Sequence, residues 1–252
     1  MSETPLPTRL CTDDLAPTLA AASGTGWTCS RCKSEFALDW SAAGCPDCQE
    51  ADRGRAYRRL ERLRESGIPS RHLKFTQLAE LSGPAEFERV RDGVRRFIET
   101  PDGGMLALVG SRGVGKTQLL AGATLAMIER DRSARMIDLQ ALLADERARM
   151  AGARDSESDW LDDFGGVDLL CIDEIGRVKL TERAGELLAQ LLDVRYREYR
   201  HTLLAGNTDK SGLTAVLGDS PTSRMFETGG VIACEWPSFR TPRQRPAGEV
   251  KA

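Results

Sequence analysis

The sequence predicts a three-layer α/β domain built on a parallel sheet, preceded by a small cysteine-rich module. Apolar runs without strict alternation are typical of strands that helices cover on both faces, and five such runs occur: 105–110, 134–139, 167–173, 202–207 and 230–236. Helix-favouring segments alternate with them, as parallel strands require: 116–130, 139–152, 181–199 and 220–227. Two pairs of cysteines at metal-ligand spacing precede this pattern and indicate the separate module.

Composition and punctuation divide the rest of the chain. We expect disordered tails at 1–24 and 241–252, the cysteine module at 25–52, a basic helical linker at 53–72 and the α/β domain at 73–240. Gly67 and Pro69 end the linker helix, and a second helix is expected at 84–100. The acidic segment 154–163 has no clear pattern and is expected to be a solvated loop.

The composition is that of a globular protein without a membrane segment. The chain has 252 residues, 40% of them hydrophobic and 29% charged. No apolar stretch approaches the roughly 18–20 residues that cross a bilayer, and the N-terminus lacks the pattern of a secretory signal. We therefore expect a cytoplasmic protein without a membrane partner. A net charge of −3 excludes an overall basic field, so contact with DNA must depend on local patches.

A phosphate-binding loop follows the first predicted strand of the α/β domain. The segment GSRGVGKT has the complete spacing G-x-x-x-x-G-K-T, with a strand before it and a helix after it, a context that disfavours a chance glycine-rich turn. In such a loop the backbone N–H groups surround phosphate oxygens, Lys116 contacts the β- and γ-phosphates of ATP, and Thr117 binds Mg²⁺. The residues expected to hold the nucleotide are Gly110, Ser111, Arg112, Gly113, Val114, Gly115, Lys116, Thr117 and Gln118.

Two later strands end in polar residues suited to ATP hydrolysis. Asp173 follows a buried apolar run, where a carboxylate can hold Mg²⁺, and the adjacent Glu174 can orient or deprotonate the attacking water. The alternative is that Glu174 is only a solvated charge. Asn207 ends another strand, where its amide can sense the γ-phosphate, although an asparagine there is also a common turn or cap residue.

These motifs, together with LLDVRYREYRHTLLAGNTD, SRMFE and WPSFR, resemble the DnaC/IstB-type AAA+ ATPases over roughly residues 67–240. This family includes replicative-helicase loaders and the helper ATPases of some transposases. The resemblance implies a P-loop NTPase domain of the AAA+/ASCE type with little or no C-terminal lid, since only twelve residues follow Arg240. It also implies that Arg224 is an arginine finger that enters the ATP site of a neighbouring copy. Arg240 and Arg195 match family positions with less defined roles, Arg195 as a possible brace of a subunit contact. An exposed helix arginine is the alternative for Arg224.

The cysteine module has the ligand set of a zinc ribbon. Cys29 and Cys32 form one C-x₂-C pair, and Cys45 and Cys48 form the second. This spacing favours a closed tetrahedral Zn²⁺ site with four thiolate ligands over the alternative of four reduced, free cysteines. Its few cations and its aromatic residues favour a protein partner. Cys171 and Cys234 lie in strand patterns and are expected in the core, and Cys11 lies outside the spacing.

The resemblance and the cysteine module together favour one function. We expect an ATPase that loads a hexameric, DnaB-like replicative helicase onto single-stranded DNA, with self-association through the ATP sites. Two alternatives remain: a helper ATPase for a transposase, or an adaptor that binds ATP and rarely hydrolyses it. The basic segment 53–74 can track a phosphate backbone or serve as a solvated or protein-binding face. A weaker positional match points to Arg147, Arg149 and Arg154 as further DNA contacts.

Overall fold

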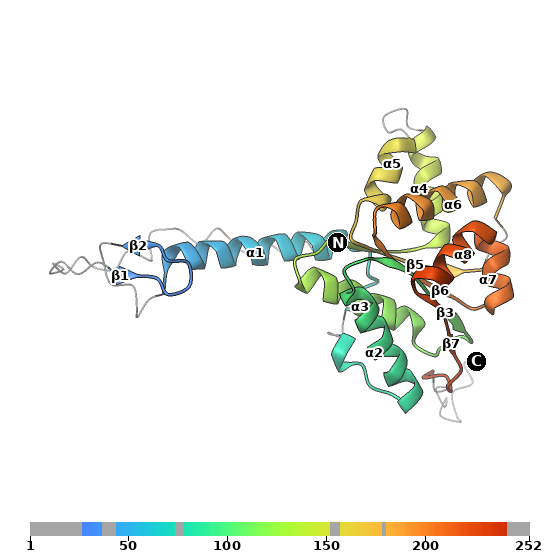
Figure 1. The fold of residues 1–252 in the computed structure, drawn as a ribbon, viewed down its shortest axis with the longest axis horizontal. Coiled ribbons are helices and arrows are strands. Elements are labelled where there is room, and N and C mark those ends of the chain that lie inside the picture. Colours follow the sequence, from blue (N-terminus) through green and yellow to red (C-terminus); the bar gives the residue numbers. More distant parts are fainter. Residues whose placement is uncertain (1–26, 37–43, 74–77, 152–156, 178–179, 241–252) are drawn as a thin grey trace, which may run out of the picture. The chain divides into compact units, whose positions relative to one another are not determined.

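The computed structural model describes residues 27–36, 44–73, 78–151, 157–177 and 180–240 (Figure 1). They belong to two compact units, Met1–Ala56 and Tyr57–Ala252. The tails expected at 1–24 and 241–252 lie outside the described residues. Among those residues, no helix combines the length and apolar character that a membrane span needs.

The first unit is held by a short antiparallel strand pair and the start of a long helix. Strand β1 (Trp27–Thr28) pairs with β2 (Glu35–Phe36), and the chain turns between them at Lys33, which has a φ of 64° and donates its N–H to the Cys29 carbonyl at 2.9 Å. Helix α1 (Pro46–Glu65) starts directly after Cys45. The helix predicted in the basic linker is therefore present but begins earlier, inside the cysteine module. The domain limits drawn from the sequence stay predictions.

The second unit contains a five-stranded parallel sheet in the order β4-β5-β6-β3-β7. Its strands are β3 (Gly104–Gly110), β4 (Ala134–Asp138), β5 (Leu169–Ile175), β6 (His201–Gly206) and β7 (Gly230–Cys234). Strand β6 lies between β3, which leads into the phosphate-binding loop, and β5, which carries the acidic pair. The carboxyl ends of these three neighbouring strands therefore bring all the predicted ATP-site motifs to one edge of the sheet.

Helices cover both faces of this sheet, which confirms the predicted three-layer fold (Figure 1). One face packs against α2 (Ala85–Glu99), α3 (Lys116–Glu129) and the short 3₁₀ helix η2 (Leu78–Glu80). The other packs against α4 (Leu139–Ala151), α6 (Glu182–Arg197) and α8 (Asp219–Thr228). Helix α5 (Glu157–Gly165) packs against α4 and α6, and α7 (Lys210–Leu217) packs against α6 and α8. Along β3, Leu106 and Leu108 face the α3 side, whereas Met105, Ala107 and Val109 face the other side. Burial on both faces explains why the apolar run does not alternate.

The expectation of a solvated loop at 154–163 is wrong for the part that the structure describes. Residues Glu157–Gly165 form helix α5, and its Trp160 and Phe164 are buried, with ring centroids 5.4 Å apart. A spacing of four residues places both rings on one helical face, while α5 packs against α4 and α6 and leaves acidic residues on the opposite face. Helix α7 was also missed; the Asp209 side chain caps it by accepting the Gly212 N–H at 2.8 Å.

Candidate functional site

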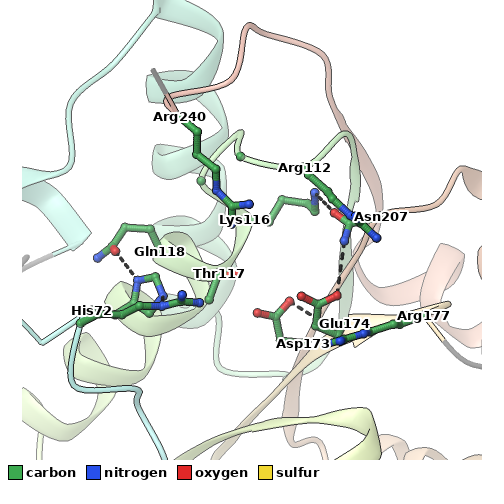
Figure 2. A pocket seen from close by; sticks show the side chains of 13 residues that line it. His72, Arg112, Lys116, Thr117, Gln118, Asp173, Glu174, Arg177, Asn207 and Arg240 are labelled. Atoms are coloured by element: carbon green, nitrogen blue, oxygen red, sulfur yellow. Dashed lines mark hydrogen bonds between the residues drawn. The ribbon is translucent and has the colours of Figure 1, made fainter. Parts of the chain in front are cut away.

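A cavity of about 490 Å³ lies at the carboxyl edge of strands β3, β5 and β6 (Figure 2). Polar and charged side chains from five separate segments of the second unit converge on it. Its lining residues are Arg71, His72, Arg112, Gly113, Gly115, Lys116, Thr117, Gln118, Asp173, Glu174, Arg177, Asn207 and Arg240. This position, at the ends of parallel strands and at the start of a helix, is where α/β domains bind phosphate-bearing ligands.

The phosphate-binding loop joins β3 to α3 in a conformation that depends on glycine. Gly113 has a φ of 84°, and a Cβ there would lie 2.1 Å from the Ser238 Oγ, so a side chain is excluded. Lys116 is the first residue of α3, and its Nζ donates to the carbonyls of Gly110 at 2.9 Å and Ser111 at 2.7 Å. Burial lowers the pKa of Lys116. The ammonium therefore lies inside the loop, held by carbonyl oxygens in the position where a phosphate would arrive.

The last described segment of the chain crosses back over this loop. The Phe239 N–H donates to the Gly113 carbonyl at 2.9 Å, and the Trp236 indole N–H donates to the Val114 carbonyl at 2.9 Å. These contacts fix the loop from outside and carry Arg240 into the cavity, above Lys116 (Figure 2). The resemblance assigned Arg240 no defined role, and the structure gives it a position beside the candidate phosphate site.

The acidic pair lies near the end of β5, where the pairing with β6 is irregular. Asp173 is 9% exposed, and one of its carboxylate oxygens accepts the N–H of Glu174 at 2.8 Å. Glu174 has a φ of 59°, a left-handed conformation that costs a residue with a side chain about 1 kcal/mol or more. This backbone geometry directs the Glu174 carboxylate into the cavity, toward Asn207 (Figure 2).

Asn207 connects the lysine and the acid across the cavity. It follows the end of β6, the strand between β3 and β5. Its side-chain oxygen accepts a hydrogen bond from Lys116 Nζ at 3.0 Å, and its amide nitrogen donates to the Glu174 carboxylate at 3.3 Å. A single asparagine thus contacts the group suited to bind phosphate and the group suited to activate water, in a geometry that a γ-phosphate would alter.

Most sequence-predicted site residues meet in this cavity, but the sequence missed three. Arg71 and His72 reach it from the segment after α1, where the His72 Nδ1 lies 2.6 Å from the Gln118 side-chain oxygen. Arg177 reaches it from the turn after β5. The sequence did contain a hint for Arg177, because a cation three residues after the acidic pair must lie close to the same strand end. Of the predicted loop residues, Val114 points into the core and is fully buried.

Arg224 lies on α8, outside this cavity. Its guanidinium forms an ion pair with Asp193 on α6 and lies over the Tyr196 ring, 5.1 Å from the centroid. The Tyr196 hydroxyl in turn donates to Glu227 at 3.0 Å. Because an arginine finger acts on the site of another copy, a position outside its own cavity does not test that role, which stays a prediction.

Arg195 has a different role from the suggested brace of a subunit contact. Its side chain is fully buried, and its guanidinium donates to the carbonyls of Phe164, Gly165, Val167 and His201 and to the Thr202 hydroxyl. Burial lowers the pKa of Arg195 to about 9. Because this pKa is still above 7, the guanidinium stays protonated at neutral pH. Arg195 therefore fastens the end of α5 and the start of β5 to β6 within one chain.

The four cysteines of the first unit converge as the spacing predicted. Their sulfur atoms all lie within 4.8 Å of one another, with Cys29 and Cys48 3.8 Å apart and Cys32 and Cys45 3.5 Å apart. Tetrahedral zinc with Zn–S bonds of about 2.3 Å needs sulfur separations of about 3.8 Å, so the residues fit this metal. Hydrogen bonding to Ser34 lowers the pKa of Cys32 to about 6, whereas burial raises the pKa of Cys48 to about 12.

Several cations suggested as DNA contacts are engaged within the chain. Arg59 and Arg62 pair with Asp131, and Arg149 pairs with Asp145 and Asp163. Arg154 and Lys74 lie outside the described residues. Cys171 and Cys234 are buried, as expected for core residues, and Cys11 lies outside the described part.

Part of the chain is similar in sequence to known proteins. A family model described as IstB-like ATP binding protein matches residues 88–226, more than half of the chain. Over 150 residues the chain is 27% identical to the replicative helicase loader DnaC of Escherichia coli (strain K12), covering 58% of this chain and 61% of that protein. Over 151 residues it is 31% identical to the insertion sequence IS232 putative ATP-binding protein of Bacillus thuringiensis subsp. berliner, covering 58% of each. The chain thus spans about three fifths of the length of these relatives.

Solved structures share the fold. The crystal structure of the DnaC helicase loader superposes with a TM-score of 0.59 at 21% identity, covering 66% of this chain and 99% of that one. AMPPCP-bound DnaA from Aquifex aeolicus gives a TM-score of 0.57 at 17% identity, covering 66% of this chain and 50% of that one. The family match, supported by this fold and by the converging ATP-site motifs, leads to one conclusion: the chain belongs to the family of IstB-like ATP-binding proteins.

Proposed function

We propose that this chain is an AAA+ ATPase that loads a hexameric replicative helicase onto single-stranded DNA. The observation that carries the ATPase assignment is the hydrogen-bonded path from Lys116 through Asn207 to Glu174. It joins a phosphate-binding cation, a γ-phosphate sensor and a general base within one cavity. A site that only bound a nucleotide would not require a second carboxylate beside Asp173, held there by the left-handed backbone conformation of Glu174.

The residues of the cavity divide the work of hydrolysis. Gly113 and Gly115 let backbone N–H groups approach the phosphates, and Lys116 carries the charge that binds the β- and γ-phosphates. Thr117 and Asp173 supply the hydroxyl and carboxylate oxygens that Mg²⁺ prefers, and the ion neutralises phosphate charge when bound. Glu174 accepts a proton from the attacking water, and Asn207 holds Glu174 in place.

Loading a helicase requires that ATP drive an exchange of protein partners. Arg224 would enter the ATP site of a neighbouring copy, so that hydrolysis depends on assembly. The similarity to a protein named as a replicative helicase loader supports the helicase as partner. The Cys₄ module supports the same proposal, because a closed zinc site would fix the shape of a small docking element in the first unit.

A transposase helper is the second candidate. The similarity to the IS232 protein supports it, since that relative belongs to an insertion sequence. The ATP-site residues do not separate the two candidates, because both need the same chemistry. The partner protein separates them.

Complex formation with the cognate replicative helicase tests the proposal. Size-exclusion chromatography with light scattering would compare the intact chain with a variant lacking residues 1–45, which keeps α1 whole, each with and without ATP. We expect a defined complex with the intact chain and none with the truncated chain. Absence of a complex in every condition would favour the transposase helper, and hydrolysis unaffected by Arg224→Ala would favour an adaptor with little turnover.

A further inference from the structure

Four arginines line the nucleotide cavity at 71, 112, 177 and 240 without a part in the proposed mechanism, and Arg177 is the one that follows the candidate base within the same segment. Arg177 lies in the turn after β5, where its N–H donates to the Glu174 carbonyl at 3.2 Å. It lines the nucleotide cavity and also an adjoining cavity of about 460 Å³, so its side chain stands where the two meet. Its side chain lines the same cavity as Asp173 and Glu174 (Figure 2). We propose that Arg177 is a catalytic residue that stabilises the γ-phosphate of ATP bound in its own chain.

Several arginines outside the cavity are already held within the chain, whereas Arg112, Arg177 and Arg240 of the cavity have no ion pair to another described residue. Arg224 is held by Asp193, Arg149 by two aspartates, and Arg195 by backbone carbonyls. Among the described residues, Arg177 has neither an ion pair nor a side-chain hydrogen bond, and it is exposed to the cavity. The Arg177 guanidinium lines a cavity with two carboxylates but forms an ion pair with neither of them, so it is free to bind an anion that enters the cavity.

The charge of the cavity calls for such an anion. Around Asp173 and Glu174 stand five cations: Lys116 and the arginines at 71, 112, 177 and 240. Arg71 donates to His72 and Lys116 donates to Asn207 and to carbonyls of the loop. Arg177 is the cation that comes from the same strand end as the candidate base. A triphosphate would offset the positive excess, and its terminal phosphate would lie nearest to Arg177 and Glu174.

Arg177 would act as charge moves during hydrolysis. The water oxygen forms a bond to the γ-phosphorus while the bond from that phosphorus to the β–γ bridging oxygen breaks, and the electron pair leaves on ADP. Glu174 takes the proton of the water and passes it to the released phosphate or to solvent. Negative charge spreads over the γ-oxygens in the transition state, and two N–H groups of one guanidinium can bind them. Because Arg177 belongs to the chain that binds the ATP, its contribution needs no neighbour.

This inference rests on the proposed ATPase activity, and nucleotide affinity tests it separately from activity. On a Glu174→Gln background, which blocks turnover, Arg177→Ala should weaken ATP binding about tenfold and ADP binding less than twofold, because only ATP has a γ-phosphate. Arg89→Ala is the control, since Arg89 lies on α2 and is exposed. Arg177→Lys should recover part of the ATP affinity. Equal losses for ATP and ADP, or no loss, would overturn the inference.

Mixing variants tests whether Arg177 acts in its own chain. With Glu174 intact, Arg177→Ala should lower the single-turnover rate about 10²-fold or more, as for other arginines on a transferred phosphate. A Lys116→Ala chain cannot bind ATP but can lend its arginines to a neighbour. Mixed with Arg224→Ala, it should restore hydrolysis if Arg224 acts between chains; mixed with Arg177→Ala, it should not. Rescue of Arg177→Ala by this mixture would overturn the inference while the ATPase stands. An inactive wild-type chain would instead overturn the proposed activity and leave the affinity result for Arg177 intact.

Discussion

Replacing Arg195 by methionine should destabilise the second unit strongly. The methionine is similar in length but offers no donor, so it would leave five acceptors without their partner. Arg195 donates at 2.7, 3.1 and 2.9 Å to the carbonyls of Phe164, Gly165 and Val167, and at 2.9 Å to the Thr202 hydroxyl, besides its bond to the His201 carbonyl. These acceptors are buried around a side chain with no measurable exposure, so water cannot easily replace the donors.

The expected loss follows from these contacts. Each hydrogen bond contributes about 1 kcal/mol net, and removing one partner from a buried charged cluster costs about 3–5 kcal/mol. Methionine would recover part of the loss, because the cost of burying the guanidinium disappears. We therefore expect the free energy of unfolding to fall by about 3–4 kcal/mol. Lysine in place of Arg195 should restore little, since one ammonium cannot reach all the acceptors spread around the edge of the guanidinium.

Urea unfolding of the full chain at pH 7, followed by far-UV circular dichroism and tryptophan fluorescence, measures this loss. Arg197→Met is the matched control: Arg197 lies two residues away on α6, its side chain is 64% exposed, and its one ion pair to a described residue is with Asp193. Its replacement should change the free energy of unfolding by less than about 0.5 kcal/mol. If Arg195→Met lost less than about 1 kcal/mol while abolishing self-association, the assignment of Arg195 to the core would be refuted and a subunit contact would be favoured.

Three further outcomes are expected. Cys45→Ser should remove the zinc that the intact chain binds, about one ion per chain by elemental analysis, whereas Cys171→Ser, in the sheet core, should keep it; equal zinc contents would contradict the Cys₄ site. Asp193→Asn should release Arg224 and lower the protein concentration at half-maximal ATPase rate about two- to fivefold, and an unchanged or higher concentration would speak against an intramolecular restraint on Arg224. Although burial opposes it, hydrogen bonds from a neighbouring arginine and serine lower the pKa of Asp168 to about 2 from an ordinary value of 3.8. The stability that this carboxylate contributes is therefore complete above about pH 4 and is lost as the pH falls toward 2; the difference in urea midpoint between wild type and Asp168→Asn should shrink over that interval, and a constant difference would contradict the ionisation.

Sequence patterns revealed the parts of the ATP site that consist of consecutive residues. The loop from Gly110 to Thr117 and the acids at 173 and 174 each carry their meaning within one short segment. The strands before them are apolar at every position, because both faces of the sheet are covered. The alternation of these apolar runs with helix-favouring segments then predicted the three-layer fold.

The remaining site residues depend on contacts between distant segments. His72 joins the cavity through Gln118, 46 residues later in the chain, and no local pattern indicates that pairing. Arg195 looks like any helix arginine until the carbonyls around it are known. Helix α5 was missed because its acidic residues outnumber Trp160 and Phe164, and two aromatic residues four positions apart are a weak signal of periodicity.

The left-handed backbone of Glu174 means that stability and activity favour different residues at this position. A glycine there would adopt the same φ of 59° without steric cost, so Glu174→Gly should raise the melting temperature slightly while removing the candidate base. A selection for heat resistance alone would therefore tend to discard Glu174, whereas a selection for replication or transposition would retain it. Comparing the residue at position 174 that survives each selection would reveal, without any enzyme assay, whether the Glu174 carboxylate is retained for its chemistry.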